Sequence, residues 1–423
     1  MSDPLKILRP VDGAWSATAK KLDSYRWKQL RLRHGHFGSA MRFSRDAILD
    51  FFYGLRTIHA IKQSAPGAEP CDFLLLQGAP KVIHLQRKKK LIDRLRDNGH
   101  HLIETAQEDP ADVLKKKRLA RPPQKLPLRY LCYAAYAQWL VCHYTPKVLI
   151  NDRNGSLLSP FLRLSLHHQD SPLVHLAHAT TVESSRLLGM TDYDYYFLFG
   201  QSSLNALRQR PLRFGTTSAV LSGSHMIDDS FNLSKSASEK RNLLILGVGP
   251  DKEKESGYEQ TYMLLAQWSE NHPEFQVIFK PHPRSKSIFW KDMAKHCRTI
   301  EVLKNNCSLA KALSHSSLVV NIMSNAVIEA ALAQRPIIYV NAGTDQDIFE
   351  QEKFFGTKVE TLQDLEQRIN NIYLDYSQAM IAAEKFAAHH LNYGSEGLKK
   401  TVEFLESLKN RRDVPHETLK ELL

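Results

Sequence analysis

Apolar runs of four or five residues alternate along most of the chain with longer segments whose apolar positions recur every three or four residues. The short runs predict buried strands, and the longer segments predict amphipathic helices. Strands and helices that alternate at this spacing form βαβ units, in which the strands lie parallel in one sheet. The pattern therefore predicts an α/β protein with parallel, doubly wound sheets.

The regular alternation starts near residue 72 and forms two series of predicted strands. The first series comprises the apolar runs 72–76, 101–104, 148–151, 173–177 and 195–199. The second series comprises the runs 242–246, 275–279, 300–303, 318–322 and 337–340. Between the first two strands, residues 81–97 predict one basic amphipathic helix, and Ser202 and Ser203 are predicted to cap a helix over 204–208. Each series predicts a Rossmann-like sheet of its own.

A stretch rich in Ser, Asp and Asn, residues 222–240, separates the two series and has little apolar periodicity. Such a composition is typical of a linker between domains. We therefore predict an N-terminal domain over residues 1–230, a second domain over 231–385 and C-terminal helices over 386–423. These helices are expected to cross back to the first domain. Residues 1–70 carry helical signals with many charges and no motif.

The composition is that of an enzyme-sized protein without metal or disulfide signals. The chain has 423 residues, 43% of them hydrophobic, which is enough for two cored domains. No window approaches the roughly 18 apolar residues of a membrane span, and the N-terminus lacks the apolar region of a signal peptide. The five cysteines form no CxxC pair, and no HExxH occurs among the 19 histidines. We expect a cytoplasmic protein with no structural metal.

The formal net charge is +12, and the excess of cations leans toward the N-terminal part. The basic runs are 20–33, 87–90 and 115–118. Each run alone is explained by a solvated helix face. Together they favour an acidic partner surface, and anionic lipid headgroups or a phosphorylated glycan fit as well as nucleic acid does. A peripheral position on the inner face of the plasma membrane is therefore a hypothesis.

The most informative motif follows the predicted strand 275–279. There the chain reads Lys-Pro-His-Pro-Arg over residues 280–284. The prolines fix φ and stop the strand, so Lys280, His282 and Arg284 are expected on a stiff corner. Ligands of α/β proteins bind at the carboxyl ends of parallel strands, and this cationic corner favours an anion, above all a phosphate.

Two other strand ends in the second series carry polar or flexible residues. Ser324 and Asn325 follow the run 318–322 at a predicted helix start, with Glu329 about one turn further on. Free N–H groups of a helix start suit a phosphate, although a plain Ser cap also explains Ser324. Gly247 and Gly249 follow the run 242–246 without the third glycine of a dinucleotide fingerprint, which argues against a nicotinamide cofactor. They suit a close backbone approach to a ligand, or a tight turn.

The segments FKPHPRS and SNAVIEAALAQRPIIYV resemble the C-terminal, nucleotide-binding half of GT-B transferases that use cytidine-linked donors. These are bacterial sialyl-, polysialyl- and Kdo transferases of capsule and lipopolysaccharide synthesis and, more distantly, CDP-glycerol glycerophosphotransferases. The resemblance covers residues 242–340. It implies two Rossmann-like domains that face each other across a cleft. It also implies site roles: Lys280, His282 and Arg284 at the nucleotide phosphate, Ser324 and Asn325 at the helix end, and Glu329 at the ribose.

The first series should supply the catalytic group, since sugar transfer to a hydroxyl needs a base or a carboxylate nucleophile. Asp152 follows the run 148–151, and His178 and Glu183 follow the run 173–177. A turn cap or a pair with Arg153 also explains Asp152, and a satisfied buried histidine also explains His178. His178 resembles the histidine of the His-Gly pair of CDP-glycerol polymerases, although alanine here replaces the glycine.

The resemblance implies a glycosyltransferase that moves a sugar, Kdo or sialic acid, from a CMP-linked donor to a cell-surface glycan or glycolipid. The CMP-sugar is a substrate and no cofactor is expected, because a cationic corner can stabilise the single leaving phosphate without a metal. The alternatives are a CDP-glycerol or other polyol-phosphate transferase, and a UDP-sugar 2-epimerase-like enzyme, which needs no acceptor. A nucleic-acid or nucleotide-sugar binding protein is the non-enzymatic alternative. The sequence contains no recognised nucleic-acid-binding module, which argues against the nucleic-acid alternative.

Overall fold

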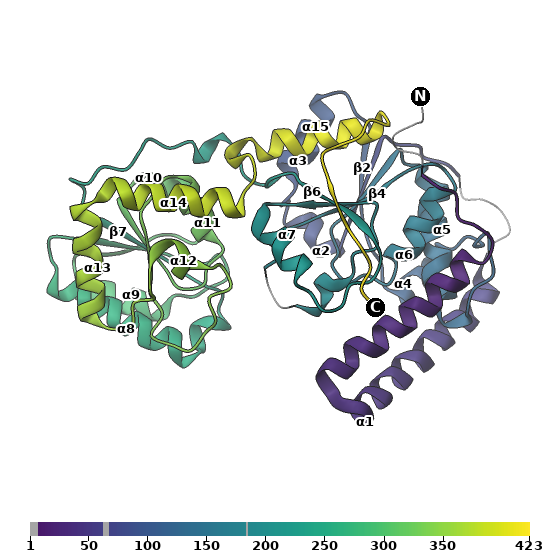
Figure 1. Cartoon of the computed structure of the whole chain (residues 1–423), viewed down its shortest axis with the longest axis horizontal. Helices are drawn as coiled ribbons and strands as arrows, with labels where there is room; N and C mark the ends of the chain where they lie inside the picture. The colour runs from purple at the N-terminus through teal and green to yellow at the C-terminus, as the bar shows by residue number, and fades with distance from the viewer. Residues whose placement is uncertain (1–6, 62–66, 183–184) are drawn as a thin grey trace. The chain divides into compact units, whose positions relative to one another are not determined.

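The computed structural model describes residues 7–61, 67–182 and 185–423, and the chain divides into two compact units (Figure 1). Unit 1 comprises the described residues up to Met226 together with Leu398–Leu423, and unit 2 comprises Ile227–Gly397. Each unit has its own sheet and its own hydrophobic core. The predicted α/β class with two largely parallel sheets is confirmed.

Unit 1 is built on a seven-stranded sheet in the order β12-β6-β5-β4-β3-β1-β2. The strands are β1 Phe73–Gln77, β2 Leu102–Ala106, β3 Val148–Asn151, β4 Leu173–Leu176, β5 Tyr195–Leu198, β6 Thr217–Leu221 and β12 Glu417–Leu419. All neighbours pair parallel except β12, which pairs antiparallel with β6. The apolar pattern does not predict β6 and β12, because both begin with polar residues and β12 has only three.

Helices cover both faces of the unit 1 sheet. They are α1 Ala14–Ala60, α2 Pro80–His84, α3 Lys89–Asp97, α4 Pro110–Lys116, α5 Leu131–Tyr144, α6 Ser159–His167, α7 Gln201–Arg208 and α15 Gly397–Lys409, with 3-10 turns at Leu128–Tyr130 and Arg186–Gly189. The core on one face joins strand residues such as Phe73 and Val174 to Leu91 of α3 and Leu405 of α15. No described helix carries an apolar stretch long enough to cross a bilayer.

Unit 2 has a five-stranded parallel sheet in the order β11-β10-β7-β8-β9. Its strands are β7 Asn242–Leu246, β8 Gln276–Lys280, β9 Ile300–Val302, β10 Leu318–Asn321 and β11 Ile337–Tyr339. Its helices are α8 Ser256–Asn271, α9 Ile288–His296, α10 Leu309–Ser314, α11 Ala326–Leu332, α12 Gln351–Phe355, α13 Leu362–Leu374 and α14 Tyr376–His390, with 3-10 turns at Asp229–Phe231, Lys252–Lys254 and Gly394–Glu396. The predicted strands of this unit all lie within two residues of the observed ones.

The long helix α1 is a hairpin of two helical arms. The backbone leaves helical geometry at Gly35, whose φ of 61° suits glycine better than any residue with a side chain. The arms contact each other through Arg26, which donates to Asp50 at 2.7 Å. Figure 1 shows the two arms, coloured purple, side by side and antiparallel in unit 1. The helical signals of the N-terminal region thus correspond to this hairpin.

The single helix predicted over residues 81–97 is wrong, because the chain forms α2, then a break, then α3. The break contains Gln86 in a left-handed conformation with φ 48°. At its end Lys88 turns inward and is only 3% exposed. A lysine in the middle of a basic run predicts a solvated position, so the run itself gives no sign of this turn.

The C-terminal helices divide between the units. Helix α14 packs on α11 inside unit 2, whereas α15 and β12 belong to unit 1. Leu398, Val402 and Leu405 of α15 join the core that lies on the unit 1 sheet. The expected return of the C-terminal helices to the first domain is therefore confirmed for α15, and the unit boundaries lie between residues 226 and 227 and between residues 397 and 398.

The predicted capping role of Ser202 and Ser203 is wrong, because α7 begins earlier, at Gln201, with Gly200 at its N-cap. Both serines lie inside the helix. The hydroxyl of Ser203 instead accepts a hydrogen bond from the backbone N–H of Thr181 at 3.0 Å. This bond ties α7 to the loop after β4.

We expect Leu405→Ala to destabilise unit 1 by about 2–5 kcal/mol, because it removes a fully buried side chain from the core beneath α15. Urea denaturation followed by circular dichroism measures the change. Leu374→Ala is the control, since Leu374 is 84% exposed and should shift the unfolding midpoint little. Equal effects of the two substitutions would mean that α15 does not contribute to the core.

Candidate functional site

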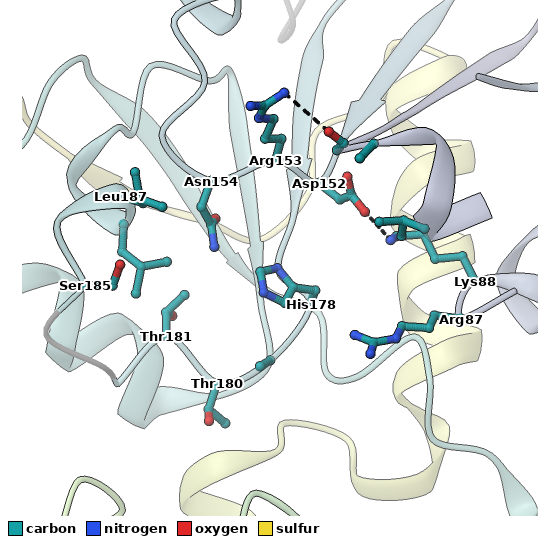
Figure 2. A pocket seen from close by; sticks show the side chains of 15 residues that line it. Arg87, Lys88, Asp152, Arg153, Asn154, His178, Thr180, Thr181, Ser185 and Leu187 are labelled. Carbon is teal, nitrogen blue, oxygen red and sulfur yellow. Dashed lines mark hydrogen bonds and ion pairs between the residues drawn. The ribbon is translucent and has the colours of Figure 1, made fainter. Parts of the chain in front are cut away.

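A pocket of about 510 Å³ lies in unit 1 at the carboxyl ends of β1, β3 and β4 (Figure 2). These three strands are neighbours in the sheet, so the residues that follow them meet at one edge. Gly78 follows β1, Asp152 follows β3 and His178 follows β4, and all three line the pocket. Two of the three predicted catalytic residues, Asp152 and His178, are thereby brought together. The third, Glu183, lies outside the described residues.

Asp152 forms a buried ion pair with Lys88. The Lys88 ammonium donates to Asp152 Oδ2, and the side chains are 3% and 6% exposed. The other carboxylate oxygen, Oδ1, is buried and has no hydrogen-bond partner among the described residues. A buried acceptor without a donor is costly, so a hydrogen bond from a ligand hydroxyl to this oxygen would be favourable.

Lys88 lines the pocket and was not predicted as a site residue. It reaches Asp152 only because the chain breaks between α2 and α3, so that Lys88 lies at the N-cap of α3 rather than on a solvated helix face. The neighbouring Lys89 shows the contrast, because it is exposed and pairs with Asp93 on the helix surface. Nothing in the local sequence separates the two lysines, and only the long-range partner does.

The alternative in which Asp152 pairs with Arg153 is not observed. The backbone N–H of Arg153 donates to Asn151 Oδ1 at 2.8 Å, and its guanidinium donates to the carbonyl of Gly78 at 3.4 Å. Figure 2 shows the guanidinium of Arg153 turned away from the Lys88–Asp152 pair. Arg153 thus joins the ends of β1 and β3 and shapes the pocket wall.

His178 is exposed on the loop that lines the pocket, so the alternative of a satisfied buried histidine is wrong at this position. The buried histidine is His175, in β4 itself. Its Nε2 lies 2.9 Å from Asn154 Oδ1, and its ring stacks on Tyr193 with centroids 4.3 Å apart. Burial, with contributions from His178 and Lys88, holds the pKa of His175 well below its usual range. His175 is therefore neutral, and it contacts Asn154, which lines the pocket.

The lining of the pocket includes three cationic residues and three residues with hydroxyls, beside apolar ones. Arg87 lies beside Lys88, and Figure 2 shows its guanidinium reaching toward the loop that carries His178. The hydroxyls of Thr180 and Thr181 are buried, and neither has a hydrogen-bond partner among the described residues. Unpaired buried hydroxyls beside cations suit a polar ligand that carries hydroxyl and acidic groups.

In unit 2 the predicted cationic corner and glycine turn pack against each other. The N–H of Gly247 donates to the carbonyl of Lys280 at 2.9 Å. A Cβ at Gly247 would lie 2.8 Å from that carbonyl oxygen and 3.1 Å from the nitrogen of His282, so only glycine fits. A Cβ at Gly249 would lie 3.6 Å from the guanidinium of Arg284. The strands β7 and β8 are neighbours, which explains the meeting of the two loops.

Asn305 fixes the corner and was not predicted. Its amide donates to the carbonyls of His282, Pro283 and Ser285, the last at 2.8 Å. Lys280 is half-buried, and its ammonium donates to the carbonyl of Pro281 at 2.9 Å. Burial lowers the pKa of Lys280 below its usual value. An anion at the corner would offer this ammonium a stronger acceptor than a carbonyl oxygen.

Ser324, Asn325 and Glu329 lie on the other side of β7, after β10. The N–H of Ser324 donates to Asn321 Oδ1 at 3.0 Å, and Asn325 precedes α11 without a side-chain cap. The predicted capping of this helix by Ser324 is therefore not observed. Glu329 is half-buried, and its Oε2 atom is buried with no hydrogen-bond partner among the described residues. Burial raises the pKa of Glu329 to about 7.

The described residues contain no group of three or more side chains that could hold a metal ion. Each unit thus has a candidate site of its own: a carboxylate with cations and hydroxyls in unit 1, and a cationic corner with a glycine turn and a carboxyl group in unit 2.

No protein-family model matches this chain, and no curated protein matches its sequence. Solved structures do match. A protein of Listeria monocytogenes assigned as a UDP-N-acetylglucosamine 2-epimerase is 11% identical with a TM-score of 0.53, over 82% of this chain and 99% of its own. The UDP-GlcNAc 2-epimerase of Neisseria meningitidis, bound to UDP-GlcNAc, is 12% identical with a TM-score of 0.50, over 79% and 100%.

MurG of Acinetobacter baumannii is 13% identical with a TM-score of 0.49, over 79% of this chain and 99% of its own. At such identities the likeness to the two epimerase structures concerns the fold alone. It shows the two-domain α/β fold of the GT-B type, as expected from the sequence. The expected cytidine-linked donor stays a prediction.

We expect Lys88→Met to destabilise the protein by about 3–5 kcal/mol, because it leaves the buried Asp152 carboxylate without its cation. Asp152→Asn in the same chain should recover part of this loss, since no charge then remains buried. Thermal and urea unfolding measure both variants. Lys89→Met is the matched control, and breaking its exposed pair with Asp93 should change stability by less than about 1 kcal/mol. A K88M variant as stable as K89M would contradict the buried pair.

Glu329 should make stability depend on pH. Its pKa is raised from 4.5 in the unfolded chain to about 7 in the folded one, so between these values the folded state keeps a proton that the unfolded state has lost. Its contribution to the free energy of unfolding therefore falls as pH rises from 4.5 to 7, by up to about 3 kcal/mol. Relative to Glu329→Gln, the wild type should lose stability across this window in urea titrations, and curves that stay parallel would contradict the shift. Glu366→Gln, on the exposed face of α13, is the control.

Proposed function

We propose that this protein is a glycosyltransferase that uses a nucleotide-sugar donor, with the acceptor bound in the unit 1 pocket and the donor nucleotide bound at the strand ends of unit 2. The observation that carries the proposal is the carboxylate of Asp152. One oxygen is held by Lys88, the other is buried with no partner among the described residues, and the residue lines a pocket large enough for a sugar. Such a group can accept the proton of an acceptor hydroxyl.

In the proposed reaction, the acceptor oxygen forms a bond to the anomeric carbon of the donor while the bond from that carbon to the nucleotide phosphate breaks. The proton of the acceptor hydroxyl passes to Asp152 Oδ1, and the nucleotide leaves with the electron pair of the broken bond. Lys88 fixes the carboxylate through their ion pair. Lys280, His282 and Arg284 would stabilise the charge that develops on the leaving phosphate.

We further propose that the donor is a CMP-linked sugar, Kdo or sialic acid. The sequence resemblance over residues 242–340 supports this donor, and so does the compact cationic corner, which suits a single phosphate. Gly247 and Gly249 would let the backbone approach the nucleotide, Ser324 and Asn325 would lie near the phosphate, and Glu329 would accept hydrogen bonds from ribose hydroxyls through its unpartnered Oε2.

The fold favours one second candidate, because the two structures with the higher TM-scores are epimerases. An epimerase-like enzyme would convert a UDP-sugar without any acceptor. His178 is exposed in the same pocket and would be the base of a polyol-phosphate transferase. The donors tested below therefore include CDP-glycerol.

Thermal-shift measurements with CMP, UDP and CDP-glycerol test the donor. We expect CMP to raise the melting temperature most, because the cationic corner of Lys280, His282 and Arg284 suits a single phosphate. Lys280→Ala and His282→Ala should each weaken CMP binding by about tenfold or more, as expected for loss of a charge-assisted hydrogen bond. Lys291→Ala, on the exposed surface of α9, is the control. Stabilisation by UDP alone would redirect the proposal to UDP-sugars.

Transfer assays then separate binding from catalysis. Asp152→Asn should bind CMP as the wild type does but transfer sugar about 10²–10⁴-fold more slowly. Asp292→Asn, an exposed carboxylate of α9, should transfer at the wild-type rate. Conversion of a UDP-sugar without acceptor, unaffected by CMP, would overturn the transferase proposal in favour of an epimerase.

A further inference from the structure

The second arm of the α1 hairpin, residues 36–60, is fixed to unit 1 through small and polar residues. Its buried positions are Ser39, Asp50, Gly54 and Thr57. Gly54 packs so closely on the 3-10 turn at Leu128–Tyr130 that a Cβ would lie 2.0 Å from the carbonyl oxygen of Leu128. Asp50 accepts from Arg26 at 2.7 Å and from the hydroxyl of Tyr133 at 3.2 Å. The orientation of the arm is therefore well determined within unit 1.

The opposite face of this arm is apolar and exposed. Phe37, Met41, Ile48, Phe52 and Leu55 follow one another at intervals of four, seven, four and three residues, so they form one stripe along the helix. Their exposed fractions are 79%, 61%, 55%, 58% and 37%. The usual polarity of a surface helix is thus inverted, with polar residues inside and large apolar ones outside. Several aligned apolar side chains, unlike scattered single ones, indicate a contact surface.

Cations border the apolar stripe. Arg42 and Arg56 lie along one edge of the stripe, between it and the buried face, and both are exposed. Arg31 and Arg33 lie near the bend at Gly35 and are exposed as well. Of the two acids between residues 31 and 59, Asp50 is buried against Arg26 and Asp46 pairs with Arg45. The edge of the stripe therefore presents a net positive charge.

An exposed apolar stripe with arginines at its edge matches the chemistry of an anionic bilayer surface, whose headgroups pair with the cations while the acyl region takes up the apolar side chains. We propose that the α1 hairpin docks unit 1 on an anionic membrane, with the stripe of Phe37, Met41, Ile48, Phe52 and Leu55 buried among the lipids. The helix lies in the plane of the interface. This inference rests on the hairpin alone and does not depend on the proposed transferase activity.

Sedimentation of the full chain with phosphatidylcholine vesicles, with and without phosphatidylglycerol, tests the proposal without donor or acceptor. We expect binding to the anionic vesicles. The combined substitutions F37E, M41E and F52E should weaken vesicle binding more than about 100-fold, because three apolar side chains that would enter the lipid are lost. The matched control combines M263E, I288E and L374E, at side chains of unit 2 that are 50%, 66% and 84% exposed, and it should bind as the wild type does.

Two further measurements test the role of the arginines and the alternative that the stripe contacts a second copy of the chain. R42Q combined with R56Q should weaken binding to anionic vesicles by about tenfold and leave binding to neutral vesicles unchanged. Wild-type binding that is equal on both kinds of vesicle, or retained by the F37E, M41E and F52E chain, would overturn the proposal. A wild-type dimer in solution that this chain converts to a monomer, without vesicle binding by either, would assign the stripe to a second copy instead.

Discussion

The parallel pairing of β3 with β1 on one side and β4 on the other is the constraint on which the unit 1 site depends. In a parallel sheet the chain leaves every strand at the same edge, so residues far apart in sequence meet there. Gly78, Asp152 and His178 share one pocket for this reason. The same constraint acts in unit 2, where β7 lies between β8 and β10 and gathers the cationic corner, the glycine turn and Ser324 on one edge. The strands fix where the chain leaves the sheet, and the residues that follow them carry the polar and charged groups of each candidate site.

Both units keep carboxyl oxygens that are buried and have no hydrogen-bond partner among the described residues. One in unit 1 is Oδ1 of Asp152, whose other oxygen is paired with Lys88, and one in unit 2 is Oε2 of Glu329, whose pKa burial raises to about 7. Buried acceptors without donors reduce stability, so natural proteins retain few of them. A ligand hydroxyl that donates to either oxygen recovers the lost hydrogen bond. This gives both positions a physical reason to bind hydroxylated ligands, as the nucleotide-sugar proposal requires.

Much of the fold could be predicted from sequence, because buried strands appear directly as apolar runs. All five strands of unit 2 lie within two residues of the predicted ones, and Asp152 and His178 were predicted beside strands that prove to be neighbours. The features that could not be predicted depend on distant partners. Lys88 is buried only because Asp152 lies opposite it, and β12 forms only because the C-terminal segment returns to the edge strand β6. Asn305 acts on the corner from another loop, which no local pattern shows.

Two departures from the local sequence pattern are large: a charged side chain is buried, and large apolar side chains are exposed. Lys88 is a cation that the basic run assigns to solvent and that the fold buries, whereas Phe37 and Phe52 are apolar residues that the helix should bury and that the fold exposes. Each departure costs stability on its own, and the surrounding contacts keep it in place: Asp152 holds Lys88, and Gly54 and Asp50 hold the second arm of α1. Residues whose burial contradicts the local sequence pattern are expected at sites that bind a partner. This reasoning supports the proposals that the unit 1 pocket and the exposed stripe of α1 contact other molecules, beside the donor site proposed in unit 2.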